Sequence, residues 1–270
     1  MNVIRIAAIL ACTVASSASG PTHAAEYDCL VEARNMAEIR SPVEAIIENV
    51  AVKRGDSIRK GQVIVTLESG PERAALAMAR ERAAMTGSLT AAQSRLDFAI
   101  SKERRTEQLS KQNFVSIGAL DEARTQRQLA ESELKEAREN VRLNELEVMR
   151  AEEVVKMRTM RSPFNGVVVE RYLSNGEFAT SNVKNPILKL AEIDPLHVEV
   201  VLPATLFGKI RTGIRATVHP EAPGGSYAAT VTLVDRVIDA ASGTFGVRLE
   251  LPNPNFKIPA GAKCKVEFKH

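Results

Sequence analysis

The sequence contains no tryptophan, and aromatic residues make up only 4% of its 270 residues. Proteins that bind single-stranded nucleic acid by stacking rely on exposed aromatic rings, so this composition argues against such a site. An excess of charge of one sign is also lacking, because 36 basic side chains are balanced by 33 acidic ones, for a net charge of +3. Nucleic-acid-binding domains cluster surplus Lys and Arg. We therefore expect no nucleic-acid partner.

Histidine is scarce as well. Beyond residue 24 only His197, His219 and His270 occur, and no His or Cys pair has the spacing of a metal site. His197 alternates with apolar neighbours and His219 precedes Pro220, so both are interpreted as structural. The chain also lacks a Gly-x-Ser-x-Gly elbow and a phosphate-binding loop. We expect no enzymatic activity, no cofactor and no metal.

A hydrophobic stretch long enough for a membrane span is missing. Arg5 is followed by the apolar run from Ile6 to Ala18 and then by small residues, which is the pattern of a cleaved secretory signal. The run falls short of the ~20 residues that span a bilayer, and this disfavours a retained anchor. We predict a signal peptide at residues 1–24. The alternatives that remain open are cleavage after Gly20 or Ala25 and lipidation of Cys12.

Only two cysteines, Cys29 and Cys264, lie beyond the predicted signal. An even number in an exported chain is compatible with one disulfide bond. Two buried free thiols are the alternative.

The most informative feature of the sequence is an internal repeat. Ser41–Ile47 matches Ser162–Val168, which lies 121 residues later, and Gly55-Asp56 matches Gly176-Glu177 at the same offset. Each copy alternates short β-branched runs with a Gly-acid turn, which predicts a strand-turn-strand unit. A half of about 30 residues cannot bury its own apolar face. The two halves are therefore expected to pack against each other.

Between the halves the hydrophobic period changes to that of a helix. Apolar residues recur at alternating steps of four and three, which predicts a heptad seam between two helices. The predicted seam positions are Met78, Arg82, Met85, Leu89, Ala92, Leu96 and Ala99 in the first stretch, and Leu120, Ala123, Arg127, Ala130, Leu134, Ala137, Val141, Asn144, Val148, Ala151 and Val155 in the second.

The break at residues 113–118 predicts the turn of an antiparallel hairpin. Two helices of about 40 residues would make a hairpin roughly 60 Å long. Ser69 and Glu72 form a capping-box pattern at its start, and Ser116 is placed to cap its second helix. From Pro195 onward the chain predicts short strands separated by Pro and Gly turns, with one short helix within Pro203–Ile210. Closing these strands into a barrel removes their exposed edges.

These parts, in this order, resemble the periplasmic adaptors of Gram-negative tripartite efflux systems, also called HlyD-like membrane fusion proteins. The segment Ile39–Gln62 is similar to the opening β segment of that family. Arg105, Leu109 and Ser116 have the spacing of the family's Arg-Leu-Ser signature at the hairpin tip. A further segment is similar to the barrel motif of adaptors that serve resistance-nodulation-division pumps: Asp239–Phe245, with Val247, Arg248 and Asn253.

The resemblance implies an α+β multidomain fold, in which a split lipoyl-like β domain with an inserted antiparallel coiled-coil α-hairpin is followed by a small β-barrel. The expected domains are the signal peptide at 1–24, an N-terminal β segment packing near the barrel at 25–37, lipoyl-like halves at 38–69 and 158–191, the α-helical hairpin at 70–157 and the β-barrel domain at 192–270.

The resemblance also implies a function. It identifies a non-enzymatic adaptor of the periplasm that links an inner-membrane transporter, of the resistance-nodulation-division type, to an outer-membrane channel, and that self-associates into a hexameric ring. Arg105, Leu109 and Ser116 would contact the outer-membrane duct. Because the N-terminal segment of adaptors runs back beside the barrel, the resemblance further implies a disulfide bond between Cys29 and Cys264.

Leu109 falls off the seam register set by Met78 to Ala99, which places residues 103, 106 and 110 at the helix interface. An apolar residue off the seam near a tip suggests burial by a partner. The alternatives are a local stutter that returns Leu109 to the core and ordinary tip residues without a partner.

The sequence departs from the family in two places. Longer pump adaptors continue past the barrel into a membrane-proximal domain, whereas this sequence ends at His270. We therefore expect docking on the transporter through the barrel, the N-terminal segment or another protein. Ala45 also replaces the Gly that the family usually has at the turn into the second strand of the first half.

Two other interpretations account for part of the sequence. A lipoyl or biotinyl carrier presents a Lys at a tight turn between its halves, but here about 90 residues of coiled coil replace that turn. A structural coiled-coil protein of the envelope would explain the hairpin equally well. It would not explain the split repeat or the barrel motif.

Overall fold

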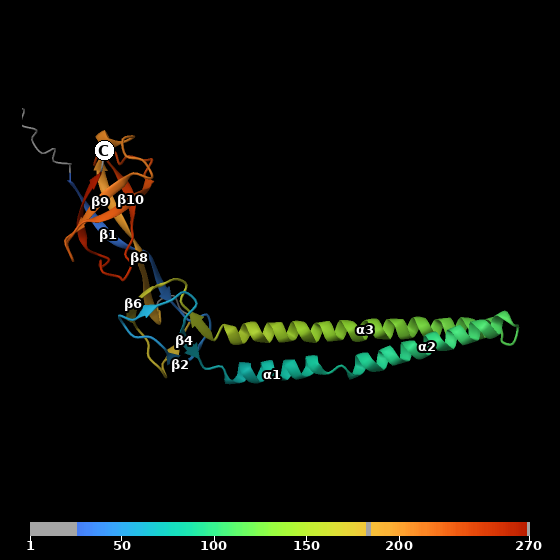
Figure 1. Ribbon diagram of the computed structural model, residues 1–270. Helices are drawn as coiled ribbons and strands as arrows, with labels where there is room; N and C mark the ends of the chain where they lie inside the picture. Colours follow the sequence, from blue (N-terminus) through green and yellow to red (C-terminus); the bar gives the residue numbers. More distant parts are fainter. Residues whose placement is uncertain (1–25, 182–184, 269–270) are drawn as a thin grey trace, which may run out of the picture. The chain divides into compact units, whose positions relative to one another are not determined.

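The computed structural model describes residues 26–181 and 185–268, which fall into two compact units. Unit 2 covers residues 34–194, and unit 1 combines residues 26–33 with residues 195–268. The predicted signal peptide and Cys12 lie outside the described residues. The elements in chain order are β1 Glu26–Ile39, β2 Ala45–Val50, β3 Ser57–Ile58, β4 Val63–Leu67, α1 Gly70–Ala84, α2 Gly87–Lys111, α3 Ile117–Lys156, β5 Thr159–Arg161, β6 Gly166–Arg171, β7 Phe178–Ala179, β8 Leu188–Pro203, η1 Ala204–Leu206, β9 Arg215–Pro220, β10 Tyr227–Val234, β11 Thr244–Leu251 and β12 Lys263–Phe268 (Figure 1).

The β part of unit 2 is built by strands of one half pairing with strands of the other. β2 pairs with β7, β3 with β6 and β4 with β5, all antiparallel. Each strand of the first half thus takes a partner that lies beyond the helical hairpin in sequence. The predicted packing of the two halves against each other is confirmed.

The hydrogen bonds between the halves repeat at the offset seen in the sequence. The amide of Gly55 donates to the carbonyl of Val168, and the amide of Gly176 donates to the carbonyl of Ile47, both at 2.8 Å. The turn that holds each Gly is fixed in the same way, because the carboxylates of Asp56 and Glu177 each accept a backbone N–H three residues upstream. The halves are therefore related by an internal two-fold repeat.

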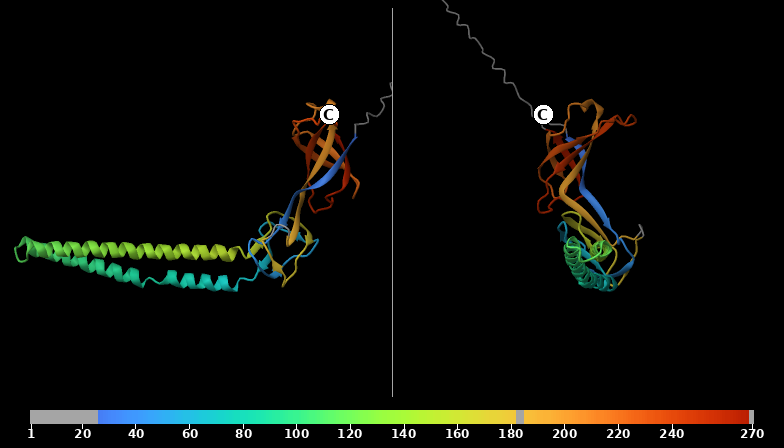
Figure 2. Two further views of the ribbon diagram at one scale, coloured as in Figure 1. Left: turned by 180° about the vertical axis from the view of Figure 1, so that it is seen from behind. Right: turned by 90° about the vertical axis from the view of Figure 1, so that its right-hand side faces the viewer.

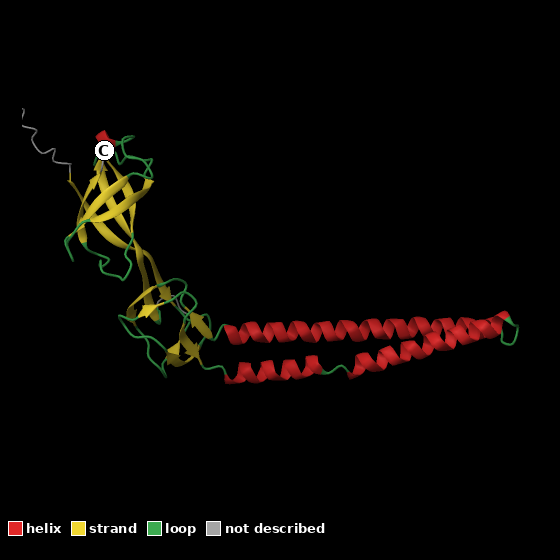
Figure 3. Ribbon diagram, in the orientation of Figure 1, coloured by secondary structure: helices red, strands yellow, loops and turns green. Residues whose placement is uncertain are grey.

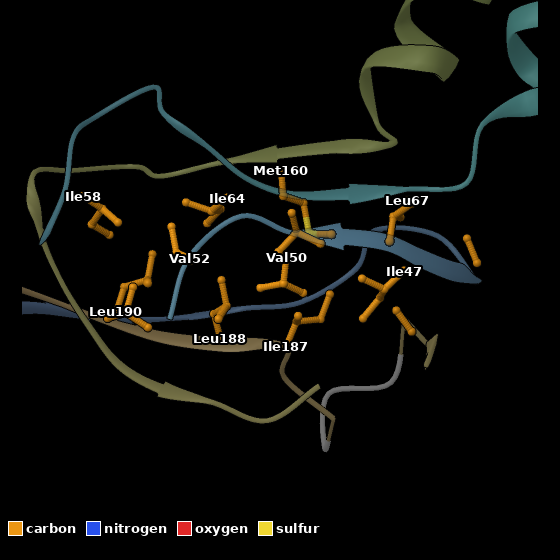
Figure 4. Close-up of a cluster of buried hydrophobic side chains, with 14 residues drawn as sticks. Ile47, Val50, Val52, Ile58, Ile64, Leu67, Met160, Ile187, Leu188 and Leu190 are labelled. Atoms are coloured by element: carbon orange, nitrogen blue, oxygen red, sulfur yellow. The ribbon is translucent and has the colours of Figure 1, made fainter. Parts of the chain in front are cut away.

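A single apolar core joins the two halves (Figure 4). Each half contributes side chains to it, and the larger labelled ones are Ile47, Val50, Val52, Ile58, Ile64 and Leu67 from the first half and Met160, Ile187, Leu188 and Leu190 from the second. Ile64 and Leu190 are both fully buried. Burial of one such side chain contributes about 1.5–3 kcal/mol, so this shared core is what holds the halves together.

The hairpin leaves the β part between the paired strands β4 and β5. Its returning arm is the single helix α3, but its outgoing arm is two helices, α1 and α2, with a loop between them (Figure 3). The expectation of two continuous helices was wrong for the first arm. The break falls at Met85 and Thr86, directly before Gly87, and glycine is among the residues least favourable to a helix.

The seam of α3 is as predicted, because every expected position from Leu120 to Val155 is buried or half-buried. The same holds for α2 from Leu89 to Ala99. In α1 the prediction was wrong: Met78 and Met85 are 59% and 68% exposed, and Arg82 is exposed. The side chains that face α3 lie one residue further along, with Ala79 buried and Ala83 half-buried. The register of α2 does not extend backward across the break.

The start of the hairpin is fixed by an ion pair. The side chain of Ser69 makes no capping hydrogen bond, so the predicted capping box was wrong. Glu72 instead pairs with Arg158, which follows α3, and both side chains are mostly buried. The amide of Leu67 also donates to the carbonyl of Arg158 at 2.8 Å. Both ends of the hairpin are thereby tied at one point.

Unit 1 is a ring of antiparallel strands. Their order is β1, β12, β9, β10, β11 and β8, and β1 also pairs with β8, so the order returns to its first strand. Along β8 and β11 buried residues alternate with partly exposed ones, as expected for strands with one face toward a core. Instead of the predicted helix within 203–210, only the short 3₁₀ turn η1 forms. The views in Figure 2 show these strands from two further sides.

Cys29 and Cys264 are register partners in β1 and β12, and a disulfide bond joins them. Their Cα atoms are 4.8 Å apart, and 235 residues separate them in sequence. The bond is shielded, since the two residues are 8% and 3% exposed. The structure thus ties the first described strand to the last.

We predict that Gly166→Ala destabilises unit 2. A Cβ at Gly166 would lie 2.1 Å from the carbonyl oxygen of Ala191, a backbone atom that cannot move without shifting β8. Overpacking of this kind costs about 1–3 kcal/mol or more. Chemical denaturation followed by circular dichroism measures the loss. Gly87→Ala is the control, because nothing lies within 4 Å of its Cβ position, and it should unfold like the wild type or slightly later.

We predict that Cys29 and Cys264 are oxidised in the exported protein and that Cys29→Ala/Cys264→Ala lowers stability. The bond closes a loop of 235 residues, which corresponds to about 5 kcal/mol in the loop-entropy model, with measured losses of about 2–5 kcal/mol. Non-reducing peptide mapping and thermal unfolding test both points. Two free thiols in protein from an oxidising compartment would contradict the prediction.

Candidate functional site: the tip of the helical hairpin

The turn between α2 and α3 has a defined conformation. Asn113 adopts a left-handed conformation with φ of +62°, which Asn tolerates better than most residues. The amide of Phe114 donates to the carbonyl of Leu109, and the amide of Asn113 donates to that of Ser110, both at 3.0 Å. This is the Schellman pattern that ends helices and satisfies their last carbonyls.

The other side of the turn is fixed by Ser116. Its hydroxyl oxygen accepts a hydrogen bond from the amide of Ala119 at 3.2 Å, at the start of α3. The predicted cap is confirmed. Caps of this kind contribute about 0.5–2 kcal/mol, so the tip is held by hydrogen bonds on both sides of the turn.

Arg105 and Leu109 lie four residues apart on α2, and both are exposed. Residues four apart share a helix face. The seam continues through Glu103, Thr106 and Ser110, which are half-buried, while Leu109 is 38% exposed. The prediction that Leu109 falls off the seam is confirmed, and no stutter returns it to the core.

The sequence analysis missed two exposed apolar residues of the turn, Phe114 and Ile117. Each is 74% exposed, about twice the exposed fraction of Leu109. Their position was visible in the sequence, since both lie within residues 113–118, where the turn is predicted. The heptad pattern did not predict their exposure, because it identifies only the apolar residues at the helix interface.

Charged residues surround the tip, and most are paired. Glu103, at a seam position, pairs with Arg127 of α3 at 3.1 Å. Lys111 lies 3.0 Å from Glu107 and holds the pKa of that carboxyl below its usual value. Within the described part of the chain, neither Arg104 nor Arg105 forms an ion pair. The tip therefore presents two free guanidinium groups beside its apolar turn.

The predicted barrel motif forms a tight turn before β11. The Asp239 carboxylate accepts hydrogen bonds from the amide of Ala241 at 2.9 Å and from the hydroxyl of Ser242 at 3.0 Å, and these hold the pKa of Asp239 below its usual value. Phe245 is buried against Phe207. Asn253 is also buried, and its amide group bridges the backbone of Ile258. Most of this motif is structural.

Apolar side chains remain exposed beside that turn. Val237 is 79% exposed and Val201 is 63% exposed, and Leu233 and Ile238 are partly exposed. In unit 2 a shallow hollow of about 420 Å³ is lined by Lys53, Arg54, Glu170 and Arg171. All four of these side chains lie at the surface.

Neither a metal cluster nor a membrane span is found in the described ranges. Residues 26–181 and 185–268 contain no group of three or more His, Cys, Asp or Glu placed to hold a metal ion. Over the same ranges no helix combines the length and hydropathy needed to cross a membrane.

Comparison with known proteins gives a consistent result. Residues 35–191 match the family described as CzcB-like, barrel-sandwich hybrid domain. The chain is 24% identical over 216 residues to the cobalt-zinc-cadmium resistance protein CzcB of Cupriavidus metallidurans, covering 77% of this chain and 38% of that protein. It is 27% identical over 233 residues to the multidrug resistance protein MdtE of Escherichia coli, covering 82% of this chain and 57% of that one.

Solved structures agree on the fold. The crystal structure of MacA from Actinobacillus actinomycetemcomitans superposes with a TM-score of 0.75 at 22% identity, covering 91% of this chain and 78% of that chain. The membrane fusion protein Spr0693 of Streptococcus pneumoniae gives a TM-score of 0.62 at 13% identity, covering 91% of this chain and 98% of the other. The expected combination of a barrel-sandwich-like β domain, a helical hairpin and a β-barrel is thereby confirmed.

Proposed function

We propose that this chain, which belongs to the CzcB-like barrel-sandwich hybrid family, is the non-enzymatic periplasmic adaptor of a tripartite efflux system. The observation that carries the proposal is the family match over residues 35–191, which spans the interlocked halves and the hairpin between them. The chain covers 38% and 57% of the two relatives' lengths. The roles below are therefore proposed for it and not transferred from them.

The β part of unit 2 is proposed to be lipoyl-like, with its halves at 38–69 and 158–191. Support comes from the reciprocal hydrogen bonds of Gly55 and Gly176. A carrier function is disfavoured, because the position between the halves where a carrier presents its Lys is taken by α1, α2 and α3. In the proposed role this domain is a base from which the hairpin projects.

The protein is proposed to work in the periplasm after removal of residues 1–24. The disulfide bond between Cys29 and Cys264 supports this location, because such bonds persist in oxidising compartments and are rare in the cytosol. The proposed partners are an outer-membrane channel at the hairpin tip and an inner-membrane transporter of the resistance-nodulation-division type at the barrel, the domain proposed for residues 192–270. Several copies, six in our proposal, would form a ring around the export path.

We predict that Arg105→Asp and Leu109→Asp each abolish export. Both side chains are exposed, so neither variant should change helicity or melting temperature. A charge placed at a desolvated contact commonly costs several kcal/mol, enough to break a weak docking contact. Export is measured as resistance of intact cells to a pump substrate, against a gene deletion. Leu129→Asp is the control on the shaft, where Leu129 is 60% exposed.

Different outcomes separate the alternatives. Normal export by both tip variants would show that the tip assignment is wrong. Unfolding of Leu109→Asp alone would place Leu109 in the core. If deletion of the gene leaves export intact but weakens the envelope, the chain is a structural coiled-coil protein.

We predict a mature N-terminus near Ala25 without lipid. The predicted signal carries the apolar run that signal peptidase substrates require. Intact mass of the protein from a periplasmic fraction decides this point. A diacyl mass on Cys12 or retention of Arg5 would contradict it.

A further inference from the structure

Phe114 and Ile117 are the most exposed large apolar side chains of the described hairpin, at 74% each. Exposed apolar residues occur singly on many surfaces. Here two of them lie three residues apart at the end of the hairpin, Phe114 in the turn and Ile117 at the first position of α3, and Leu109 lies in the last turn of α2. Together they offer more apolar area to a partner than Leu109 does alone.

The turn that carries them is already ordered. Asn113 ends α2 in the Schellman pattern, and Ser116 caps α3. A contact on this turn therefore requires little further ordering of the backbone. The entropic cost of binding is lower for this reason, which favours affinity. Large aromatic side chains in such positions are typical binding hot spots.

The charges beside the turn indicate the chemistry of the partner. Arg104 and Arg105 lie within about two turns of the end of α2 and form no ion pair within the described residues. The neighbouring carboxylates on α2, Glu103 and Glu107, pair instead with Arg127 and Lys111. Free guanidinium groups around an apolar centre are complementary to an apolar recess with a carboxylate rim.

The part of the shaft around Phe98 and Leu129 lacks this combination. Phe98 and Leu129 are 71% and 60% exposed, but the charges between them are satisfied within the hairpin. Arg95 pairs with Glu133 at 3.2 Å, and Lys102 donates to Gln126 at 2.7 Å. These two apolar residues therefore serve as matched controls for the tip.

We propose that Phe114 and Ile117 are the anchors of the hairpin tip, inserting into an apolar recess of the outer-membrane channel whose rim carries carboxylates for Arg104 and Arg105. This inference rests on the proposed function and goes beyond it. It assigns the apolar part of the contact to two residues outside the Arg-Leu-Ser spacing and states the chemistry of the surface that receives them.

The experiment begins in intact cells with a photo-cross-linking residue at Gln112, the exposed residue after α2. Mass spectrometry identifies the captured protein and the cross-linked peptide. That channel is then purified, and its affinity for the full mature chain is measured. We expect Phe114→Ala and Ile117→Ala each to weaken binding about 30-fold, which corresponds to the ~2 kcal/mol threshold of a hot spot. Phe98→Ala and Leu129→Ala should bind within about twofold of wild type.

A second arm tests the charges. Arg104→Glu should weaken binding and Arg104→Lys should restore most of it, and the affinity of the wild type should fall as salt is raised. The peptide captured by the probe should contain Asp or Glu beside apolar residues. Circular dichroism and melting temperature should be unchanged in all variants, because the altered side chains are exposed.

The outcomes separate this inference from the function on which it rests. If the probe captures no outer-membrane protein, or captures a second copy of this chain, the proposed tip contact itself is wrong. If a channel is captured but Phe114→Ala and Ile117→Ala bind like wild type, or Phe98→Ala weakens binding equally, the anchor assignment is wrong and the proposed function stands. A captured surface without carboxylates also overturns the inference.

Discussion

The structure of unit 2 depends on one constraint: neither half of the sandwich can bury its apolar face without the other. Side chains of both halves form a single core, and each strand of the first half pairs with a strand of the second. The chain must therefore leave at β4 and return at β5, which are neighbours. The segment between β4 and β5 must therefore begin and end at neighbouring positions. An antiparallel hairpin with arms of equal length meets that requirement, and the ion pair of Glu72 with Arg158 fixes its base.

The same constraint shapes the energetics of the hairpin. Its fully buried seam residues are mostly alanines, with Leu134 as the larger exception. Alanine lets helices approach closely but removes little apolar area from water, and at about 25 cal/mol per Å² such a seam gives modest stability for its length. Cross-arm pairs such as Arg80–Glu152 are exposed and contribute little. The hairpin is thus held at its base by the sandwich and at its end by the capped turn.

Periodicity in the sequence predicted the elements that rest on a continuous pattern. The seam of α3 could be read correctly because forty residues follow one register without interruption. The register of α1 could not be predicted in this way, since the break before Gly87 shifts the residues that face α3 by one position. The capping box failed because Glu72 takes a partner 86 residues away, and sequence spacing reports only local contacts. The internal repeat predicted two similar halves, but it did not predict that equivalent positions in the two halves have different surroundings.

Gly166 and Ala45 illustrate that difference, because they are equivalent positions of the repeat. Ala45 pairs with Ala179 in a place that accepts a methyl group. At Gly166 the carbonyl of Ala191 occupies the space where a methyl group would lie. A departure from the family's glycine at position 45 is tolerated for this reason.

Two of the tip residues, Phe114 and Ile117, could not be predicted from the sequence, for a different physical reason. Patterns in sequence identify residues that pack within the chain, and a residue exposed for a partner leaves no period behind it. Leu109 was found because it lies off the seam register. Phe114 lies in the turn and Ile117 is the first residue of α3, and both precede the first seam position of that helix. At the end of the hairpin, apolar area, free charge and an ordered backbone coincide. A group bound at that end is joined to the sandwich by one continuous element, because α3 runs unbroken from the tip to the sandwich.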